Sequence, residues 1–277
     1  MRIAAFLRLF SLPLLLAACA VPASYSAPDA PLRLVSFNIH AGNDAFGEPS
    51  LDRVATLLDS LEADIVLLQE VDRGTRRSGE VDQLDALSAG TGLEGFYGKA
   101  IDFDGGDYGN AVLSRWPVQS ARTIPLEVTV PEELADRSYE PRSLMHLVVE
   151  TPLGDLHVLN THLDHHPEPV FRQQQLFRIL AHLAEEVGQG GKGEMVVLGG
   201  DLNAEPDAVE IRALGLYLTD PWETCGEGPG HTFRADDPVR RIDYLLLRGA
   251  RCTGARVLES TLSDHRPLVV DVVRGGR

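Results

Sequence analysis

The chain has 277 residues, of which 41 are acidic and 25 are lysine or arginine, so its formal net charge at pH 7 is −16. Affinity for long nucleic acids depends on basic side chains that neutralise phosphates, which makes a long nucleic acid a less favoured partner. A local basic groove or a bound divalent cation could still reverse the field at one site. After its N-terminal segments, the chain is long enough for one domain with a large apolar core.

The N-terminal residues predict export from the cytoplasm. In segment 1–18, two arginines precede an apolar stretch that is too short to span a membrane, which is typical of a secretory signal peptide. The sequence Leu16-Ala17-Ala18-Cys19 resembles a bacterial lipobox, so we expect Cys19 to carry lipid and residues 19–31 to form a membrane tether. The alternative is an ordinary signal peptide followed by an incidental cysteine. Ala20 resembles the pattern for outer-membrane delivery, so we expect a cell-envelope lipoprotein facing the periplasm, or a secreted protein.

Short apolar strands alternate with a few amphipathic helices over the rest of the chain. In chain order, strands are predicted over residues 32–37, 64–70, 110–114, 144–150, 156–160, 196–198, 241–247, 255–258 and 268–273, and helices over 51–61 and 171–187. Residues 151–155 predict the turn of a hairpin. Strands that outnumber the helices, and hairpins mixed with crossovers, favour two packed sheets with the helices outside.

The strand over residues 196–198 leads into two polar side chains, Asp201 and Asn203. The exit of an interior strand can hold such groups rigidly at a cleft. The alternative is that one of them caps a further helix, since residues 205–207 resemble a helix start. Other strands end in similar residues, namely Asn38, Glu70, Asn160, His162, Asp243, Asp264 and His265. Such a set is expected when one edge of the sheets builds one site.

Five motifs along the chain resemble those of the endonuclease/exonuclease/phosphatase superfamily, which includes DNase I, repair nucleases, sphingomyelinases and inositol polyphosphate 5-phosphatases. They are Ser36-Phe37-Asn38-Ile39, Leu68-Gln69-Glu70-Val71-Asp72, Asn160-Thr161-His162-Leu163-Asp164, Gly200-Asp201-Leu202-Asn203-Ala204 and Ser263-Asp264-His265-Arg266-Pro267, with Arg241-Ile242-Asp243-Tyr244 as a sixth. The resemblance implies a four-layer α/β sandwich with two central, mostly antiparallel mixed sheets over residues 32–277. Residues 77–83 and 108–114 look more like the branch related to calcofluor-white-hypersensitivity proteins, which are linked to remodelling of glycolipid anchors.

The residue types at these motifs suit phosphoester hydrolysis. Glu70, Asn38 and Asp264 offer the hard oxygen ligands that magnesium or manganese prefers. The resemblance implies that Asp201 aligns or deprotonates the attacking water, with Asn203 beside it.

The resemblance also assigns roles to the remaining polar residues. It implies that His265 contacts the scissile phosphate and is oriented by Asp243, and that His162 can protonate the leaving group. The guanidinium of Arg142 suits a phosphate, and the remaining expected substrate or phosphate contacts are Asn110, Tyr108 and Asn160.

The favoured function is a divalent-metal-dependent phosphoester hydrolase of the cell envelope, a phosphodiesterase or phosphatase, and we expect a monomer. Its expected substrate is a phospholipid, another phosphorylated envelope molecule or a small nucleotide. A secreted or envelope nuclease is the alternative among enzymes. A non-catalytic envelope-binding lipoprotein is the alternative outside them, although such a protein would not need the whole set of polar residues.

The loops, three glutamines, three histidines and two cysteines give further predictions that the structure can test. Substrate selectivity is expected in the long polar or glycine-rich connections at residues 42–50, 73–82, 101–107, 128–139 and 224–238. We expect the glutamines at 173–175 to be solvated. His40, His165 and His166 flank the motifs and are expected at the rim of the site without an assigned role. Cys225 and Cys252 could form a disulfide in an oxidising compartment, and two free buried cysteines are equally compatible with the sequence.

Overall fold

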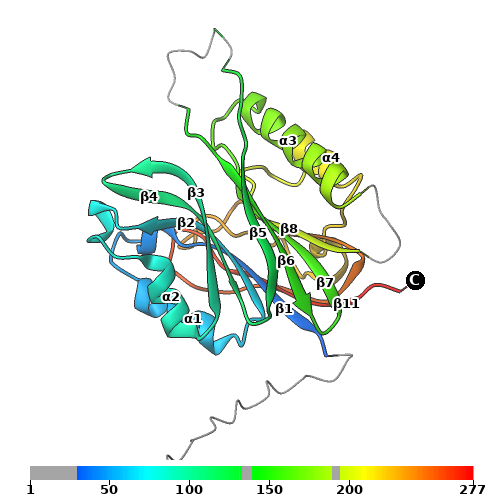
Figure 1. Ribbon diagram of the computed structural model, residues 1–277, viewed down its shortest axis with the longest axis horizontal. Helices are drawn as coiled ribbons and strands as arrows, with labels where there is room; N and C mark the ends of the chain where they lie inside the picture. The colour runs from blue at the N-terminus through cyan, green and yellow to red at the C-terminus, as the bar shows by residue number, and fades with distance from the viewer. Residues whose placement is uncertain (1–29, 131, 133–138, 189–193, 277) are drawn as a thin grey trace, which may run out of the picture.

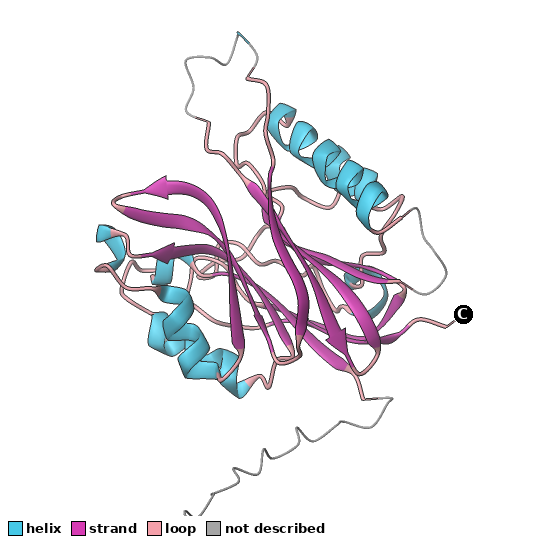
Figure 2. Cartoon of the chain, viewed as in Figure 1, coloured by secondary structure: helices cyan, strands magenta, loops and turns pink. Residues whose placement is uncertain are grey.

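Two β-sheets form the centre of the molecule in a computed structural model that describes residues 30–130, 132, 139–188 and 194–276 (Figures 1 and 2). The predicted signal peptide 1–18 and Cys19 lie outside these residues, and of the predicted tether only residues 30 and 31 are described. Within the described part of the chain, no helix is long and apolar enough to cross a membrane.

The first sheet has six strands in the order β10-β11-β1-β2-β4-β3. Its strands are β1 (Leu32–Asn38), β2 (Ile65–Arg73), β3 (Glu94–Phe103), β4 (Gly106–Ser114), β10 (Ala250–Val257) and β11 (Leu268–Arg274). Only β1 and β2 pair in parallel, and the other neighbours are antiparallel.

The second sheet has five strands in the order β5-β6-β7-β8-β9. Its strands are β5 (Val118–Pro125), β6 (Ser143–Thr151), β7 (Gly154–His162), β8 (Met195–Asp201) and β9 (Asp243–Arg248). Here only β7 and β8 pair in parallel. In both sheets, therefore, one parallel pair brings two strand ends to the same edge.

Helices cover the outer faces of the two sheets (Figure 1). The α-helices are α1 (Leu51–Ser60), α2 (Gln83–Thr91), α3 (Val170–Glu186), α4 (Val209–Leu214) and α5 (Trp222–Cys225), with short 3-10 turns η1 (His40–Gly42) and η2 (Arg76–Ser78). Helices α1 and α2 lie on the side of the six-stranded sheet, and α3 and α4 lie on the opposite side, against the five-stranded sheet. The predicted four-layer α/β sandwich is thereby confirmed.

Alternation along the strands produces three apolar layers. In β6, Met145 and Leu147 belong to the cluster between the sheets, whereas Leu144 faces the opposite way and belongs to the cluster under α3. Successive side chains of a strand point to opposite faces, so a strand with apolar residues on both faces can fill two layers at once. These continuous apolar runs are what made the central strands predictable from the sequence.

Among the strands and α-helices, four elements have no counterpart in the sequence prediction: β3, β5, α2 and the short α5. Strand β5 lies at the edge of its sheet and is mostly exposed, and β3 is a partly exposed edge strand. Neither carries the apolar run of an interior strand. The prediction of a loop over residues 101–107 was wrong, because Asp104 and Gly105, both with positive φ, form the tight turn of the β3–β4 hairpin.

The start of α4, the burial of one glutamine and a disulfide bond can each be compared with what the sequence predicts. Helix α4 begins at Val209 after the cap residue Ala208, so the expected helix start at 205–207 was wrong. Of the three glutamines expected to be solvated, Gln173 is exposed and Gln174 half-buried, whereas Gln175 is fully buried and accepts the Asp164 N–H. Cys225 and Cys252 form a disulfide, with their Cα atoms 6.3 Å apart, which decides between the two alternatives left by the sequence.

Candidate active site

A cavity of about 430 Å³ lies where the ends of both sheets meet. Eight of the predicted site residues line it: Glu70, Tyr108, Arg142, His162, Asp201, Asn203, Asp264 and His265. Four others, Asn38, Asn110, Asn160 and Asp243, are buried and do not line the cavity. Residues from opposite ends of the chain are thus brought to one place by the two sheets.

The backbone around Asp201 is shaped by a glycine that no other residue could replace without distortion. Gly200 has φ +125°, and a Cβ atom there would lie 1.9 Å from the carbonyl oxygen of Thr161 on β7. The next residues are held by their own side chains, because Asp201 Oδ1 accepts the Asn203 N–H at 2.9 Å and Asn203 Nδ2 donates to Leu163 O at 3.0 Å. Since Ala208 is the cap residue of α4, neither Asp201 nor Asn203 caps that helix.

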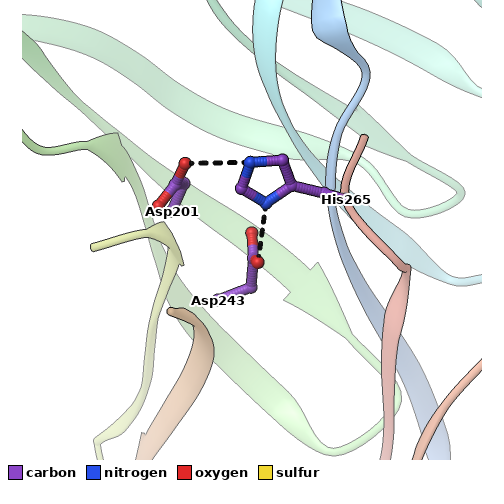
Figure 3. Close-up of side chains that lie close together, drawn as sticks. All are labelled: Asp201, Asp243 and His265. Carbon is purple, nitrogen blue, oxygen red and sulfur yellow. Dashed lines mark hydrogen bonds and ion pairs between the residues drawn. The ribbon is translucent and has the colours of Figure 1, made fainter. Parts of the chain in front are cut away.

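Asp201, His265 and Asp243 form a buried cluster (Figure 3). His265 Nδ1 lies 2.8 Å from Asp243 Oδ2, and its Nε2 lies 3.5 Å from Asp201 Oδ2. One ligand atom from each residue falls within 4.8 Å of the others, so the cluster could hold a metal ion. Asp243 itself uses His265 as its partner, which orients the ring toward Asp201.

The pKa values of two members of this cluster, Asp201 and His265, are both raised above their ordinary values. Burial raises the pKa of Asp201 above its ordinary value, although the charge of His265 acts in the other direction. Burial by itself lowers the pKa of His265, but the carboxylates of Asp243 and Asp201 outweigh it and hold that pKa above its ordinary value. A carboxyl group with a raised pKa beside a protonated imidazole is an arrangement suited to general acid–base chemistry.

His162 occupies the other side of Asp201. Its Nε2 lies 3.4 Å from Asp201 Oδ2, and its Nδ1 lies 3.0 Å from Nη1 of Arg142. Burial, followed by the charge of Arg142, holds the pKa of His162 well below its ordinary value. The two histidines flanking Asp201 therefore differ, one favouring its charged form and the other its neutral form.

Glu70 enters the cavity through an irregularity in β2. The pairing of β2 with β4 shifts register between Leu68 and Val71, and Glu70 has φ +57° within this bulge. Such bulges redirect a side chain and are frequent beside active sites. Asn38 at the end of β1 donates to Glu70 Oε1 at 3.0 Å and to Asp201 Oδ2 at 3.2 Å, and so connects the two sheets at the site.

The charges around the cavity leave two carboxylates without a close cation. Its three arginines are each paired with a carboxylate: Arg77 with Asp72, Arg142 with Glu140 and Arg240 with Glu205. Among the described residues Glu70 forms no ion pair, and Asp264 has only His40 at 3.8 Å. These two carboxylates therefore fit the oxygen ligands of a divalent cation.

The remaining predicted contacts have different surroundings. Asn160 is fully buried, where its Nδ2 donates to the carbonyl oxygens of Leu68 and Ala111 and its Oδ1 accepts from Gln69, so it joins the two sheets behind the cavity. Asn110 donates to Ser143 O at 3.4 Å. Tyr108 does line the cavity, and burial holds its pKa well above the ordinary value.

Several lining residues were not assigned a role from the sequence: Arg77, Phe103, Glu140, His165, Phe233, Arg240 and Ile242. The guanidinium of Arg77 lies 4.5 Å from the ring centroid of Phe103 and makes two hydrogen bonds to Asp72. A signal for Arg77 existed, because its partner Asp72 belongs to the same motif as Glu70. Phe233 lies in segment 224–238 and Arg77 in segment 73–82, both of which were expected to determine substrate selectivity, whereas no sequence signal indicated Arg240.

Comparisons with known proteins agree with this arrangement. A sequence profile of the endonuclease/exonuclease/phosphatase family matches residues 35–265. The protein YbhP of Escherichia coli (strain K12), itself uncharacterized, is 26% identical over 255 residues, which cover 87% of this chain and 95% of YbhP.

Solved structures show the same fold. The endonuclease/exonuclease/phosphatase from Beutenbergia cavernae DSM 12333 has a TM-score of 0.75 at 24% identity, covering 89% of this chain and 72% of that chain. The mannosyl-6-phosphatase Bt3783 of Bacteroides thetaiotaomicron VPI-5482 has a TM-score of 0.69 at 22% identity, covering 87% and 99%. Because the profile spans most of the chain and includes both Glu70 and His265, the protein belongs to the endonuclease/exonuclease/phosphatase family, whose members are phosphoester hydrolases.

Proposed function

We propose that the protein is a divalent-metal-dependent phosphoester hydrolase of the cell envelope, in which an activated water attacks the phosphorus. The observation that carries this proposal is the buried cluster of Asp201, His265 and Asp243 in a cavity that also contains two carboxylates without a close cation, Glu70 and Asp264. This combination provides an acid–base group and a metal-compatible group in the same place.

The chain's own residues divide the work of the reaction. Asp201 accepts the proton of the attacking water, since its raised pKa makes it a better base than an ordinary carboxylate. Asn203 lies next to it and helps to hold the water. His265, kept protonated and oriented by Asp243, donates through Nε2 to a phosphoryl oxygen.

Glu70 and Asp264, with Asn38 beside Glu70, would hold magnesium or manganese. The bound ion would polarise the phosphoryl group and stabilise charge on the leaving oxygen. Although Asp201, Asp243 and His265 also approach each other closely enough for an ion, we favour the first group. A histidine that donates to Asp243 and is held in its charged form has no lone pair to offer.

The substrate that we propose is a phosphorylated envelope molecule or a phospholipid, and not a long nucleic acid. All three arginines of the cavity are already paired with carboxylates, so the described residues around it provide little cationic surface for a polyanion. The disulfide between Cys225 and Cys252 supports an oxidising compartment, as expected for the exported, lipid-anchored protein that the N-terminal residues predict.

The first experiment compares the purified protein with Asp201→Asn on p-nitrophenyl phosphate and bis(p-nitrophenyl) phosphate in the presence of Mg²⁺. Loss of the base should reduce kcat by about 10²-fold or more. The panel should also contain mannose 6-phosphate, phospholipid vesicles and plasmid DNA, so that monoesterase, diesterase and nuclease activities are compared directly.

Asp207→Asn is the matched control, because Asp207 is an exposed aspartate six residues further along the chain. It should retain the wild-type rate. Equal turnover by Asp201→Asn and the wild type would refute the catalytic assignment, and efficient nicking of plasmid DNA at physiological salt would favour the nuclease alternative.

A further inference from the structure

Arg142 was expected to contact phosphate, but its guanidinium is directed at two histidines. The side chain is almost completely buried just before β6. Its Nη1 lies 3.0 Å from His162 Nδ1 and 2.7 Å from Glu140 Oε1, and its Nη2 lies 3.4 Å from His165 Nδ1. The two terminal nitrogens of the fork are therefore already engaged within the protein.

The direction of these hydrogen bonds follows from the chemistry of the guanidinium. Arginine remains protonated in proteins and has five N–H donors but no acceptor. The Nδ1 atom of each histidine must consequently accept, so that the proton of each ring is on Nε2. In His162 this Nε2 is the atom 3.4 Å from Asp201 Oδ2, which directs an N–H donor to the reacting centre.

We propose that Arg142 is a positioning residue that sets the Nε2–H tautomer of His162 and, through a longer contact, that of His165, so that both rings donate hydrogen bonds into the cavity. This inference rests on the proposed phosphoester hydrolysis. It also assigns His165, which lines the cavity at its exposed rim, as a substrate-contact residue.

The same geometry changes the role expected for His162. To protonate a leaving oxygen and return to a neutral ring, His162 would first need protons on both nitrogens. The Nδ1 position faces the N–H of Arg142, so a second proton there would set two donors against each other. His162 therefore stabilises a substrate oxygen by donating from Nε2 without giving up the proton, and the leaving group does not depend on it for protonation.

The tautomer can be measured without any activity. In ¹⁵N NMR spectra of the purified protein, the His162 signals are assigned by their loss in His162→Gln, and we expect a bare Nδ1 and a protonated Nε2. Replacing the guanidinium in Arg142→Met should move part of the population to the Nδ1–H form, whereas Arg178→Met, at an exposed arginine of α3, should leave the spectrum unchanged. A proton on Nδ1 of His162 in the wild type would overturn the proposal, even if Arg142→Met did not fold.

A second measurement separates donation from proton transfer. His162→Gln retains a neutral N–H donor, and its rate should fall by the same factor, to within about tenfold, for a p-nitrophenyl ester and for the corresponding alkyl ester. The alkyl leaving group needs a proton and the nitrophenolate does not. A loss more than about tenfold larger for the alkyl ester would identify His162 as a general acid and overturn the proposal. If the wild type hydrolyses neither ester, the proposed function fails, while the NMR result still decides the tautomer.

Discussion

Two residues that line the cavity, Glu70 and Asn203, have a backbone conformation in the left-handed region. Glu70 has φ +57°, where most residues other than glycine cost about 1–2 kcal/mol, and Asn203 has φ +48°, which asparagine adopts more readily. Each is held there by its surroundings, Glu70 by the bulge in β2 and Asn203 by its hydrogen bond to Leu163 O. Such conformations persist where the fold over-determines them and are concentrated at functional sites.

The coupled pair of Asp201 and His265 leads to a prediction about pH. Asp201 must lose its proton to act as a base, and burial raises its pKa, so kcat should rise with pH through a range above that of an ordinary aspartate. The neighbouring carboxylates raise the pKa of His265, so the rate should fall only well above the range of an ordinary histidine. A pH profile of kcat measures both the rise at low pH, the acid limb, and the fall at high pH, the alkaline limb.

The variant Asp243→Asn tests the cause of the alkaline limb. Without the Asp243 carboxylate, His265 loses its main stabilising charge and should deprotonate at lower pH, which shifts that limb toward neutrality. An alkaline limb at the same pH in both proteins would show that His265 is not the group responsible.

The positions of the motif residues at the cavity could be inferred from the sequence because each lies at the end of an apolar strand. The side chains that position these motif residues could not be inferred from the sequence. The pairing of Arg142 with His162 joins residues 20 positions apart, a spacing that has no strand or helix period. Asn160 shows the opposite error, since a polar residue at a strand end was expected to reach substrate and instead joins the two sheets.

At the scale of elements, interior strands were predictable and edge elements were not. Strand β8 has every residue buried, and its apolar run was visible in the sequence. Strand β5 is almost entirely exposed and has neither an apolar run nor strict alternation, so its pairing with β6 depends on tertiary context. The β3–β4 hairpin is a different case, because Asp104-Gly105 is a turn signal that distinguishes a tight hairpin from a long loop.

A chain of three histidines joins α3 to the second sheet. His146 on β6 lies 2.9 Å from His182 on α3 and 3.0 Å from His157 on β7, measured between ring nitrogens. Each contact has room for a single proton between the facing nitrogens. Burial, with the two neighbouring rings, lowers the pKa of His146 to about 4, and burial also lowers the pKa values of His157 and His182.

This cluster should make the fold sensitive to acid. The unfolded chain takes up a proton at His146 below about pH 6.5, whereas the folded protein resists until about pH 4, so the unfolding free energy falls as pH falls through this window. Allowing for solvent screening, we expect that in His146→Gln the acid-induced decrease in the unfolding free energy is smaller by up to about 2 kcal/mol than in the wild type. Urea unfolding at a series of pH values from neutral pH to about pH 4 measures this decrease in the unfolding free energy.

The comparison needs a histidine outside the cluster, and His231 in the segment after α5 serves this purpose. His231→Gln should retain the wild-type decline of stability with acid. If His146→Gln declines as steeply as His231→Gln, the cluster does not control acid stability.

In the whole molecule, the packing of the two sheets positions the site residues, and the overall charge affects which substrates can approach them. Asn38 and Gln69 from the first sheet bond Asp201 and Asn160 of the second, so the position of Asp201 depends on the packing of both sheets. The formal net charge of −16 repels polyanions from the surface. Family membership fixes the class of chemistry, and this charge favours compact phosphoesters over nucleic acid as the substrate that we propose.

We propose that phosphoester hydrolysis by this protein requires a divalent ion held by Glu70 and Asp264. The most direct test removes metal with EDTA and measures hydrolysis of bis(p-nitrophenyl) phosphate during a Mg²⁺ titration, for the wild type, Glu70→Gln and the exposed-site control Glu62→Gln. We expect no turnover without metal, full recovery with Mg²⁺ in the wild type and control, and at least about a tenfold higher Mg²⁺ requirement in Glu70→Gln, within the range for loss of a metal-site interaction. Hydrolysis by the metal-free protein at the rate of the Mg²⁺-loaded protein would show that the reaction does not depend on a bound divalent ion.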